Sequence, residues 1–257
     1  MSKNLSLFAG PILLNSFETS VELASKIKKA SDKSKVNYIF RTTLRNDKKI
    51  NYHGQTGLDI LDVKELLSYI RHELEIPVCI EVTSLEEIMM VAGEVDYIEI
   101  SSFLCNQDEI IVALKKSKAK LNIKKDVFQS LEDFLNSIER LQKDKLNFMI
   151  TDEGTLFGYG NIIVDNIAVA RLMEMGHDVS VDLTQSVNLP SAIGVTRYDG
   201  VKYLTMMCRS VCGVNVNAIS LYIYNNTDYT FREGPNLLVL DVLKEILDEC
   251  MRIKETI

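Results

Sequence analysis

Two short apolar runs decide the fold: PVCIEV at residues 77–82 and VDYIEI at residues 95–100. Each run is rich in β-branched and apolar residues. Both alternating faces carry such residues, which is typical of a strand that is covered on each side in a parallel sheet. Parallel strands of this kind are commonly joined by helices, so the pair predicts an α/β fold.

The same kind of run recurs along the chain. The other six are LSLFAG beginning at Leu5, VNYIF at 36–40, AKLNIK at 119–124, LNFMIT at 146–151, VSVDLT at 179–184 and NAISLYIY at 217–224. Between runs lie amphipathic stretches with apolar residues at helical spacing, such as 21–30, 58–74, 130–143 and 236–255. Eight strands that alternate with helices favour a closed (β/α)8 TIM barrel over an open doubly wound sheet. No linker divides the sequence, so we predict one barrel domain over residues 1–257.

Composition and charge exclude several classes of partner. The chain has 257 residues, of which 46% are hydrophobic, and a net charge of −7 without a basic run. A nucleic-acid partner is therefore not expected, because phosphate backbones require clustered positive charge. No run approaches the roughly 20 apolar residues that cross a bilayer, and the N-terminal apolar run is too short for a signal peptide. The five cysteines are odd in number and fit reduced thiols, so we predict a cytoplasmic protein without a membrane partner.

A barrel of this kind directs the search for function to the C-terminal ends of its strands. The longest loops that follow strands are 42–56, 185–196 and 225–235. The strand ends offer Arg41, Glu81, Ser101, Lys124, Lys125, Asp152, Glu153, Thr184, Gln185, Tyr222 and Tyr224.

Six ordered segments carry a resemblance to a known family. They are FAGPILLNS at 8–16, SSFLCNQ at 101–107, LNIKKDVF at 121–128, GTLFGYGNIIVD at 154–165, VDLTQSV at 181–187 and EGPNLLVLDVL at 233–243. In order and spacing they resemble the Kdo 8-phosphate synthase family. That family is the sister of the type I enzymes that make 3-deoxy-arabino-heptulosonate 7-phosphate.

The resemblance implies a reaction and its partners. The family condenses phosphoenolpyruvate with arabinose 5-phosphate and releases inorganic phosphate, a step in Kdo and lipopolysaccharide biosynthesis. It implies a homo-oligomer, as a tetramer, that binds phosphorylated small molecules. Some family members hold a divalent metal that positions water.

The resemblance also implies roles for particular residues. Lys125 and Glu233 fall at catalytic positions. The positions implied to contact substrate are Arg41, Asn122, Lys124, Gln107, Asn161 and Glu153.

Several positions depart from the family pattern. Glu153 and Asn106 stand where the family has arginines, and Glu153 replaces one that grips phosphate. Three of the four positions that bind metal in the family read Ile12, Gln185 and Tyr222. We therefore predict no metal and no other cofactor. Replacing a phosphate-binding arginine by a carboxylate removes an attraction and adds a repulsion, so we predict that the synthase activity is reduced or lost.

Two alternatives to a weak synthase stay open. One is a catalytically inactive family member that binds a phosphorylated ligand or a protein partner. The other is a barrel with different chemistry, which would use Glu81, Glu153 or Tyr222.

Each singled-out residue also has a structural alternative. Arg41 could pair internally with Glu81 or Glu99, and Glu153 could pair with a nearby lysine. Glu233 could cap a helix that begins near Asn236. Lys124 and Lys125 are adjacent on a strand, so only one of them can point into the barrel mouth, and a lysine there could instead cap carbonyls at the rim.

Overall fold

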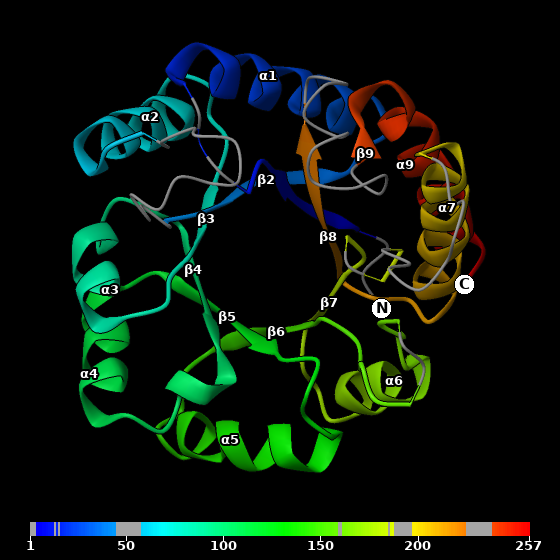
Figure 1. Ribbon diagram of the computed structural model, residues 1–257. Coiled ribbons are helices and arrows are strands. Elements are labelled where there is room, and N and C mark those ends of the chain that lie inside the picture. Colours follow the sequence, from blue (N-terminus) through cyan, green and yellow to red (C-terminus); the bar gives the residue numbers. More distant parts are fainter. Residues whose placement is uncertain are drawn as a thin grey trace.

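The computed structural model describes residues 4–12, 14, 16–44, 58–158, 161–184, 186–187, 197–224 and 238–257. Eight parallel strands close into a barrel because β1 pairs with both β2 and β8 (Figure 1). The strands are β1 (Ser6–Gly10), β2 (Asn37–Thr43), β3 (Val78–Glu81), β4 (Tyr97–Ser101), β5 (Lys120–Lys125), β6 (Phe148–Asp152), β7 (Val179–Asp182) and β8 (Ala218–Tyr224). The predicted TIM barrel is confirmed.

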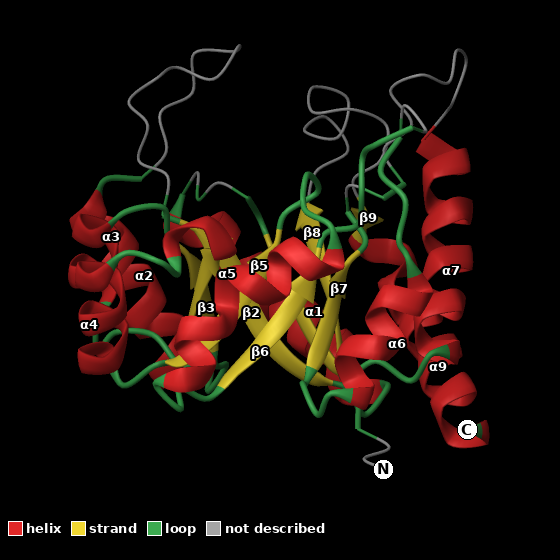
Figure 2. Ribbon diagram, turned by 90° about the horizontal axis from the view of Figure 1, so that it is seen from below, coloured by secondary structure: helices red, strands yellow, loops and turns green. Residues whose placement is uncertain are grey.

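Helices surround the barrel on the outside, as Figures 1 and 2 show from two directions. They are α1 (Phe17–Lys33), α2 (Ile60–His72), α3 (Leu85–Val91), α4 (Asp108–Ser117), α5 (Leu131–Lys143), α6 (Asn166–Glu174), α7 (Arg197–Gly213) and α9 (Leu240–Thr256). A 3-10 turn, η1 (Ser102–Leu104), follows β4, and a two-residue strand, β9 (Leu238–Val239), pairs with β8. The stretch 236–255 was predicted to be helical throughout. Its residues 238–239 instead extend the sheet, and the helix begins at Leu240.

Side-chain caps set the start of most helices. Ser16, Ser84 and Ser130 each accept a hydrogen bond from a backbone N–H in the first turn of α1, α3 and α5. Asp59 and Asp165 do the same for α2 and α6. These residue types are favoured at such positions because they satisfy backbone donors that the helix itself leaves unpaired.

The inward face of the barrel is divided into an apolar and a polar layer. Near the N-terminal ends of the strands, Phe8, Ile39, Cys79 and Ala218 form a small apolar cluster with Tyr97 and Met149 against it. Further along the strands the inward side chains form a polar layer. The fully buried ones are Arg41, Glu99, Asn122, Thr151, Ser180 and Ser220. The other face of each strand packs with the helices in the main hydrophobic core. The polar layer lies on the side of the C-terminal ends of the strands.

Candidate functional site at the C-terminal end of the barrel

Arg41 is the centre of the polar layer. Its side chain is fully buried and points inward from β2. The guanidinium donates to Glu99 Oε1 at 2.6 and 3.0 Å and to Asp182 Oδ2 at 2.6 Å. The Cζ atom of Arg41 also lies 4.6 Å from the centre of the Tyr222 ring. Arg41 therefore forms two internal ion pairs, one of them with the predicted alternative partner Glu99.

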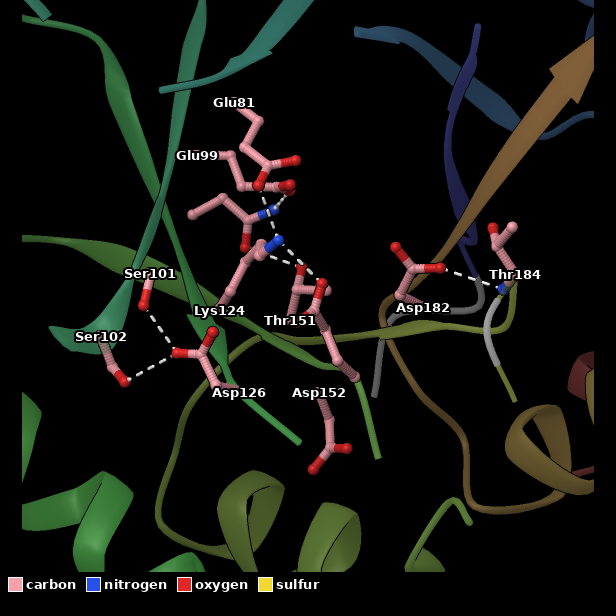
Figure 3. A network of polar contacts seen from close by, with 12 residues as sticks. Glu81, Glu99, Ser101, Ser102, Lys124, Asp126, Thr151, Asp152, Asp182 and Thr184 are labelled. Atoms are coloured by element: carbon pink, nitrogen blue, oxygen red, sulfur yellow. Dashed lines mark hydrogen bonds and ion pairs between the residues drawn. The ribbon is translucent and has the colours of Figure 1, made fainter. Parts of the chain in front are cut away.

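Lys124 forms a second centre closer to the mouth. Its ammonium lies 2.8 Å from Glu81 Oε1 and 2.8 Å from Glu153 Oε1. Tyr222 completes this group, since its hydroxyl donates to Glu81 Oε2 at 3.1 Å. Figure 3 shows Glu81, Glu99 and Lys124 turned toward one another. The alternative in which Glu153 pairs with a nearby lysine thus describes the observed contact.

These two centres together define what we call the C-terminal cluster: Arg41, Glu81, Glu99, Lys124, Glu153 and Asp182. Two cations face four carboxylates within it. Both cations already have carboxylate partners from the chain itself. The cluster is therefore anionic when its carboxyl groups are ionised, which is opposite to what two phosphorylated substrates require.

Burial and pairing separate the pKa values of the carboxyl groups. Burial raises the pKa of Glu153 to about 7, against the opposing attraction of Lys124. Burial likewise raises the pKa of Glu99, although Arg41 opposes it. Burial would also raise the pKa of Glu81, but the charges of Lys124 and Arg41 outweigh it and the pKa is lowered. Glu81 is thus the ionised partner of Lys124, and Glu153 is the group that exchanges a proton near neutrality.

Lys125 lies on the opposite face of β5 from Lys124. Its ammonium donates to the Gly154 carbonyl at 2.9 Å and lies 3.7 Å from Asp152 Oδ2. Figure 3 shows the Asp152 carboxylate apart from the group around Lys124. Because neighbouring residues on a strand point to opposite sides, only Lys124 faces into the barrel. The catalytic role of Lys125 stays a prediction, and the structure does not bring this residue to the C-terminal cluster.

Of the other predicted substrate contacts, Asn122 lies beside the cluster, whereas Gln107 and Asn161 lie in segments after β4 and β6. Asn122 is fully buried, and its amide donates to Glu99 Oε2 at 2.6 Å and accepts from the Thr151 hydroxyl. Gln107 precedes α4 with an exposed side chain. Asn161 lies in the loop after β6, and its Oδ1 is buried without a hydrogen-bond partner among the described residues. Glu233 lies outside the described residues.

The residues at the family's metal positions do not fit a metal where the structure describes them. The Ile12 side chain has no atom that can bind a metal, and the Tyr222 hydroxyl is hydrogen-bonded to Glu81. Gln185 and Glu233 lie outside the described residues. In the described part of the chain, no group of three His, Cys, Asp or Glu side chains is arranged to hold a metal ion.

Comparison with known proteins supplies the ancestry. A sequence model of the DAHP synthetase I family matches residues 2–228. The chain belongs to this family. A relative from a Synechococcus species, named 2-dehydro-3-deoxyphosphooctonate aldolase, is 26% identical over 254 residues, which is 98% of this chain and 89% of the relative.

Two further relatives carry the same name. The one from Fusobacterium nucleatum is 27% identical, over 99% of this chain and 92% of its own length. The one from Bartonella henselae is 28% identical, over 96% and 88%. The resemblance to Kdo 8-phosphate synthases that the six segments indicated is confirmed.

Within this family fold, sequence reasoning missed the role of Asp182. This residue is 141 positions from Arg41 along the chain, yet its carboxylate is the second partner of the guanidinium. It also accepts the backbone N–H of Thr184 at 3.0 Å. A charged residue at an inward position of a buried strand was the available signal, because such a side chain must find a partner inside the barrel.

Proposed function

We propose that this chain is a divergent Kdo 8-phosphate synthase-like protein in which the condensation of phosphoenolpyruvate with arabinose 5-phosphate is slow or lost. One observation carries the proposal. The ammonium of Lys124, which the resemblance assigns to phosphoenolpyruvate, is held by Glu81 and Glu153 at 2.8 Å each. A phosphorylated substrate would have to displace these carboxylates before it could use the same cation.

The cost of this exchange supports weak binding. A lost hydrogen bond to a charged group costs roughly 1.5–3 kcal/mol, and a factor of ten in affinity corresponds to about 1.4 kcal/mol. Glu153 also brings a negative charge to the position where the family has a phosphate-binding arginine. We expect dissociation constants for phosphoenolpyruvate in the millimolar range.

Arg41 does not compensate for this loss. Its guanidinium binds Glu99 and Asp182 at full burial, so an anion at the mouth meets a cation that is already neutralised. Unpairing a buried charge would cost about 3–5 kcal/mol, which a single phosphate contact does not restore. Arg41 therefore supports the barrel interior, and substrate binding through it stays a prediction.

The test is a coupled phosphate-release assay with phosphoenolpyruvate and arabinose 5-phosphate, without added metal and with manganese. The Fusobacterium nucleatum relative serves as the matched control under the same conditions. We expect kcat/KM to be lower than that of the control by a factor on the order of 10² to 10⁴ or more, from the lost charge contacts alone. A kcat/KM within tenfold of the control would refute the proposal.

The same assay separates the inactive alternative. If no phosphate is released, the chain is a catalytically inactive family member, and calorimetry with each substrate then tests whether it still binds a phosphorylated ligand. If manganese restores turnover, the prediction that this protein uses no metal is wrong.

Assembly and location are part of the proposal. We propose a cytoplasmic homo-oligomer, as a tetramer by analogy with the family. Phe128 and Phe157 support a contact surface, because both rings are more than half exposed and meet edge-to-face at 6.4 Å. No helix in the described residues is long and apolar enough to cross a membrane. A monomer in light scattering at micromolar concentration would contradict the assembly.

A further inference from the structure

The N-terminal mouth of the barrel contains a cavity that no part of the proposed function uses. Its volume is about 690 Å³. Two smaller hollows of about 470 and 410 Å³ adjoin it and share Tyr97 with it. We call the 690 Å³ space the N-terminal cavity. Its size falls within the range of small-molecule sites, which is roughly 300–1,000 Å³.

The floor of this cavity is apolar and partly aromatic. Phe8 and Met149 line it from the apolar layer of the barrel interior, and Phe8 is 1% exposed. The ring of Tyr97 meets Phe8 edge-to-face, with centroids 5.3 Å apart. Phe148 adds a further ring to the wall. The partly exposed side chains of Tyr97, Phe148 and Met149 offer contact area to a flat apolar group above the buried Phe8, because apolar atoms that leave water there are favourably buried.

The rim of the cavity is positive in a chain of net charge −7. Three lysines and one aspartate line it: Lys115, Lys118, Lys120 and Asp178. Lys115 is paired with Asp144 at 3.0 Å. Asp178 accepts a hydrogen bond from the Asn217 amide, which leaves its charge in place but satisfies one of its oxygens.

The other two lysines have no carboxylate partner in the described part of the chain. Lys120 contacts Tyr97 instead, with its ammonium 3.5 Å from the hydroxyl and 5.2 Å from the ring centre. This arrangement keeps the cation over the apolar floor. An anion that entered the cavity would meet two lysine charges without displacing a carboxylate, unlike an anion at the C-terminal cluster.

We propose that the N-terminal cavity binds a small organic anion that joins a phosphate or carboxylate group to a flat apolar body. The anionic group binds Lys118 and Lys120 at the rim. The apolar body lies against Tyr97, Phe148 and Met149. This site is separate from the C-terminal cluster, so its test does not depend on whether the protein turns over phosphoenolpyruvate.

The experiment is a titration of the whole protein, labelled at its methionine methyl groups, with phenyl phosphate and with benzoate. Nuclear magnetic resonance follows the methyl signal of Met149, which is assigned through Met149→Leu. We expect saturable shifts of this signal with one or both anions, whereas the exposed Met89 on α3 stays unchanged. The anion that binds more tightly identifies the preferred head group. Benzylamine, which has the same ring but a positive charge, should produce no saturable shift.

Charge variants locate the site. The double variant Lys118→Glu, Lys120→Glu should weaken binding at least tenfold. The matched control is Lys118→Glu, Lys116→Glu, because Lys116 is exposed on α4 and does not line the cavity. This control should bind more tightly than the first double variant. If the first double variant fails to fold, as seen by circular dichroism, Lys120→Gln replaces it and should weaken binding measurably.

Three results would overturn the proposal. One is the absence of a saturable Met149 shift with either anion up to about ten millimolar, a range in which even weak small-ligand sites register. Another is equal binding of benzylamine. The third is unchanged affinity in the folded Lys120 variants, which would place the ligand elsewhere.

Discussion

Lys120 and Lys124 lie on the same face of β5, one near each mouth of the barrel, and their surroundings differ. Lys124 is 8% exposed and lies 2.8 Å from each of two carboxylates. Lys120 is exposed, and the described contacts of its ammonium are with Tyr97. The two residues have the same side chain and the same strand. What differs is whether the chain itself supplies the counter-charge.

This difference determines whether the lysines at each end of the barrel are free to bind an anion. In the C-terminal cluster, positive charge is used to compensate buried carboxylates, so it supports structure more than it attracts ligands. In the N-terminal cavity, Lys118 and Lys120 have no carboxylate partner among the residues that the structure describes, so both stay available to an anion. The presence of lysines at a barrel end is therefore a weak guide to anion binding until their partners are known.

Arg41 offers the largest expected effect. Arg41→Met would leave Glu99 and Asp182 buried without their cation, so we expect the free energy of unfolding at pH 7 to fall by about 3–5 kcal/mol. Urea unfolding measures it. The control is Arg171→Met, because Arg171 pairs with Glu132 at the surface, where both side chains are about half exposed or more. That variant should lose at most about 0.5 kcal/mol. Equal losses in the two variants would show that the buried ion pairs of Arg41 stabilise the protein no more than a surface ion pair does.

Charge reversal at the mouth should have the next largest effect. Glu153→Arg removes one of the carboxylates that hold Lys124 and supplies a phosphate-binding group, so phosphoenolpyruvate should bind more tightly by a factor on the order of 10 to 100. Calorimetric titration compares it with Glu139→Arg, which makes the same charge change on the exposed face of α5. We do not expect this substitution to restore turnover, because Gln185 and Tyr222 still differ from the residues that the family has at these positions. Micromolar binding by the unaltered protein would contradict the placement of Glu153 in this pocket.

The sequence was sufficient for the barrel and for two of the ion pairs inside it, Arg41 with Glu99 and Glu153 with a lysine, which were stated as alternatives, but not for the other partners. Alternating apolar runs locate strands, and strand alternation correctly limited the inward position to one of Lys124 and Lys125. Which inward side chains meet across the closed barrel depends on how all eight strands are placed together, and no local pattern specifies this. The contacts of Arg41 with Asp182 and of Tyr222 with Glu81 each join residues 141 positions apart.

The N-terminal cavity escaped sequence reasoning for another reason. In a barrel fold, catalytic residues are expected at the C-terminal ends of the strands. Lys118 and Lys120 lie at the opposite end, just before and at the start of β5. A lysine at the first position of a strand does not by itself indicate a binding site. The contacts of Lys120 with Tyr97 in the structure are what point to one.

The proton on Glu153 gives a pH dependence of intermediate size. Its pKa is raised from 4.5 to about 7 in the folded protein. Between pH 4.5 and about pH 7, the folded state therefore keeps a proton on Glu153 that the unfolded state releases. This contribution to stability is fully present below pH 4.5 and is lost as the pH rises through about 7.

Glu153→Gln should remove this fall, because glutamine does not titrate. We expect the variant to gain on the order of 2 kcal/mol relative to the unaltered protein between pH 5 and pH 8. Urea unfolding at both pH values gives the difference, with Glu139→Gln as the exposed control. A stability difference that does not change with pH would mean that Lys124 keeps Glu153 ionised throughout.

The smallest expected effect on stability is that of Lys120→Met, at the opposite end of the barrel from Arg41. Lys120→Met removes a cation whose described contacts are with the Tyr97 ring and hydroxyl, and it leaves no buried carboxylate behind. An exposed cation–π contact is worth about 0.5–1 kcal/mol, and the methionine still covers part of the ring, so the free energy of unfolding should fall by at most about 0.5 kcal/mol. Lys116→Met, on the exposed side of α4, gives the baseline in the same urea experiment. The binding of phenyl phosphate should nevertheless weaken in Lys120→Met and not in Lys116→Met, since Lys120 lines the cavity and Lys116 does not. A loss of stability as large as that of Arg41→Met would show that Lys120 is a structural residue like Arg41, and the contrast between the two mouths would then fail.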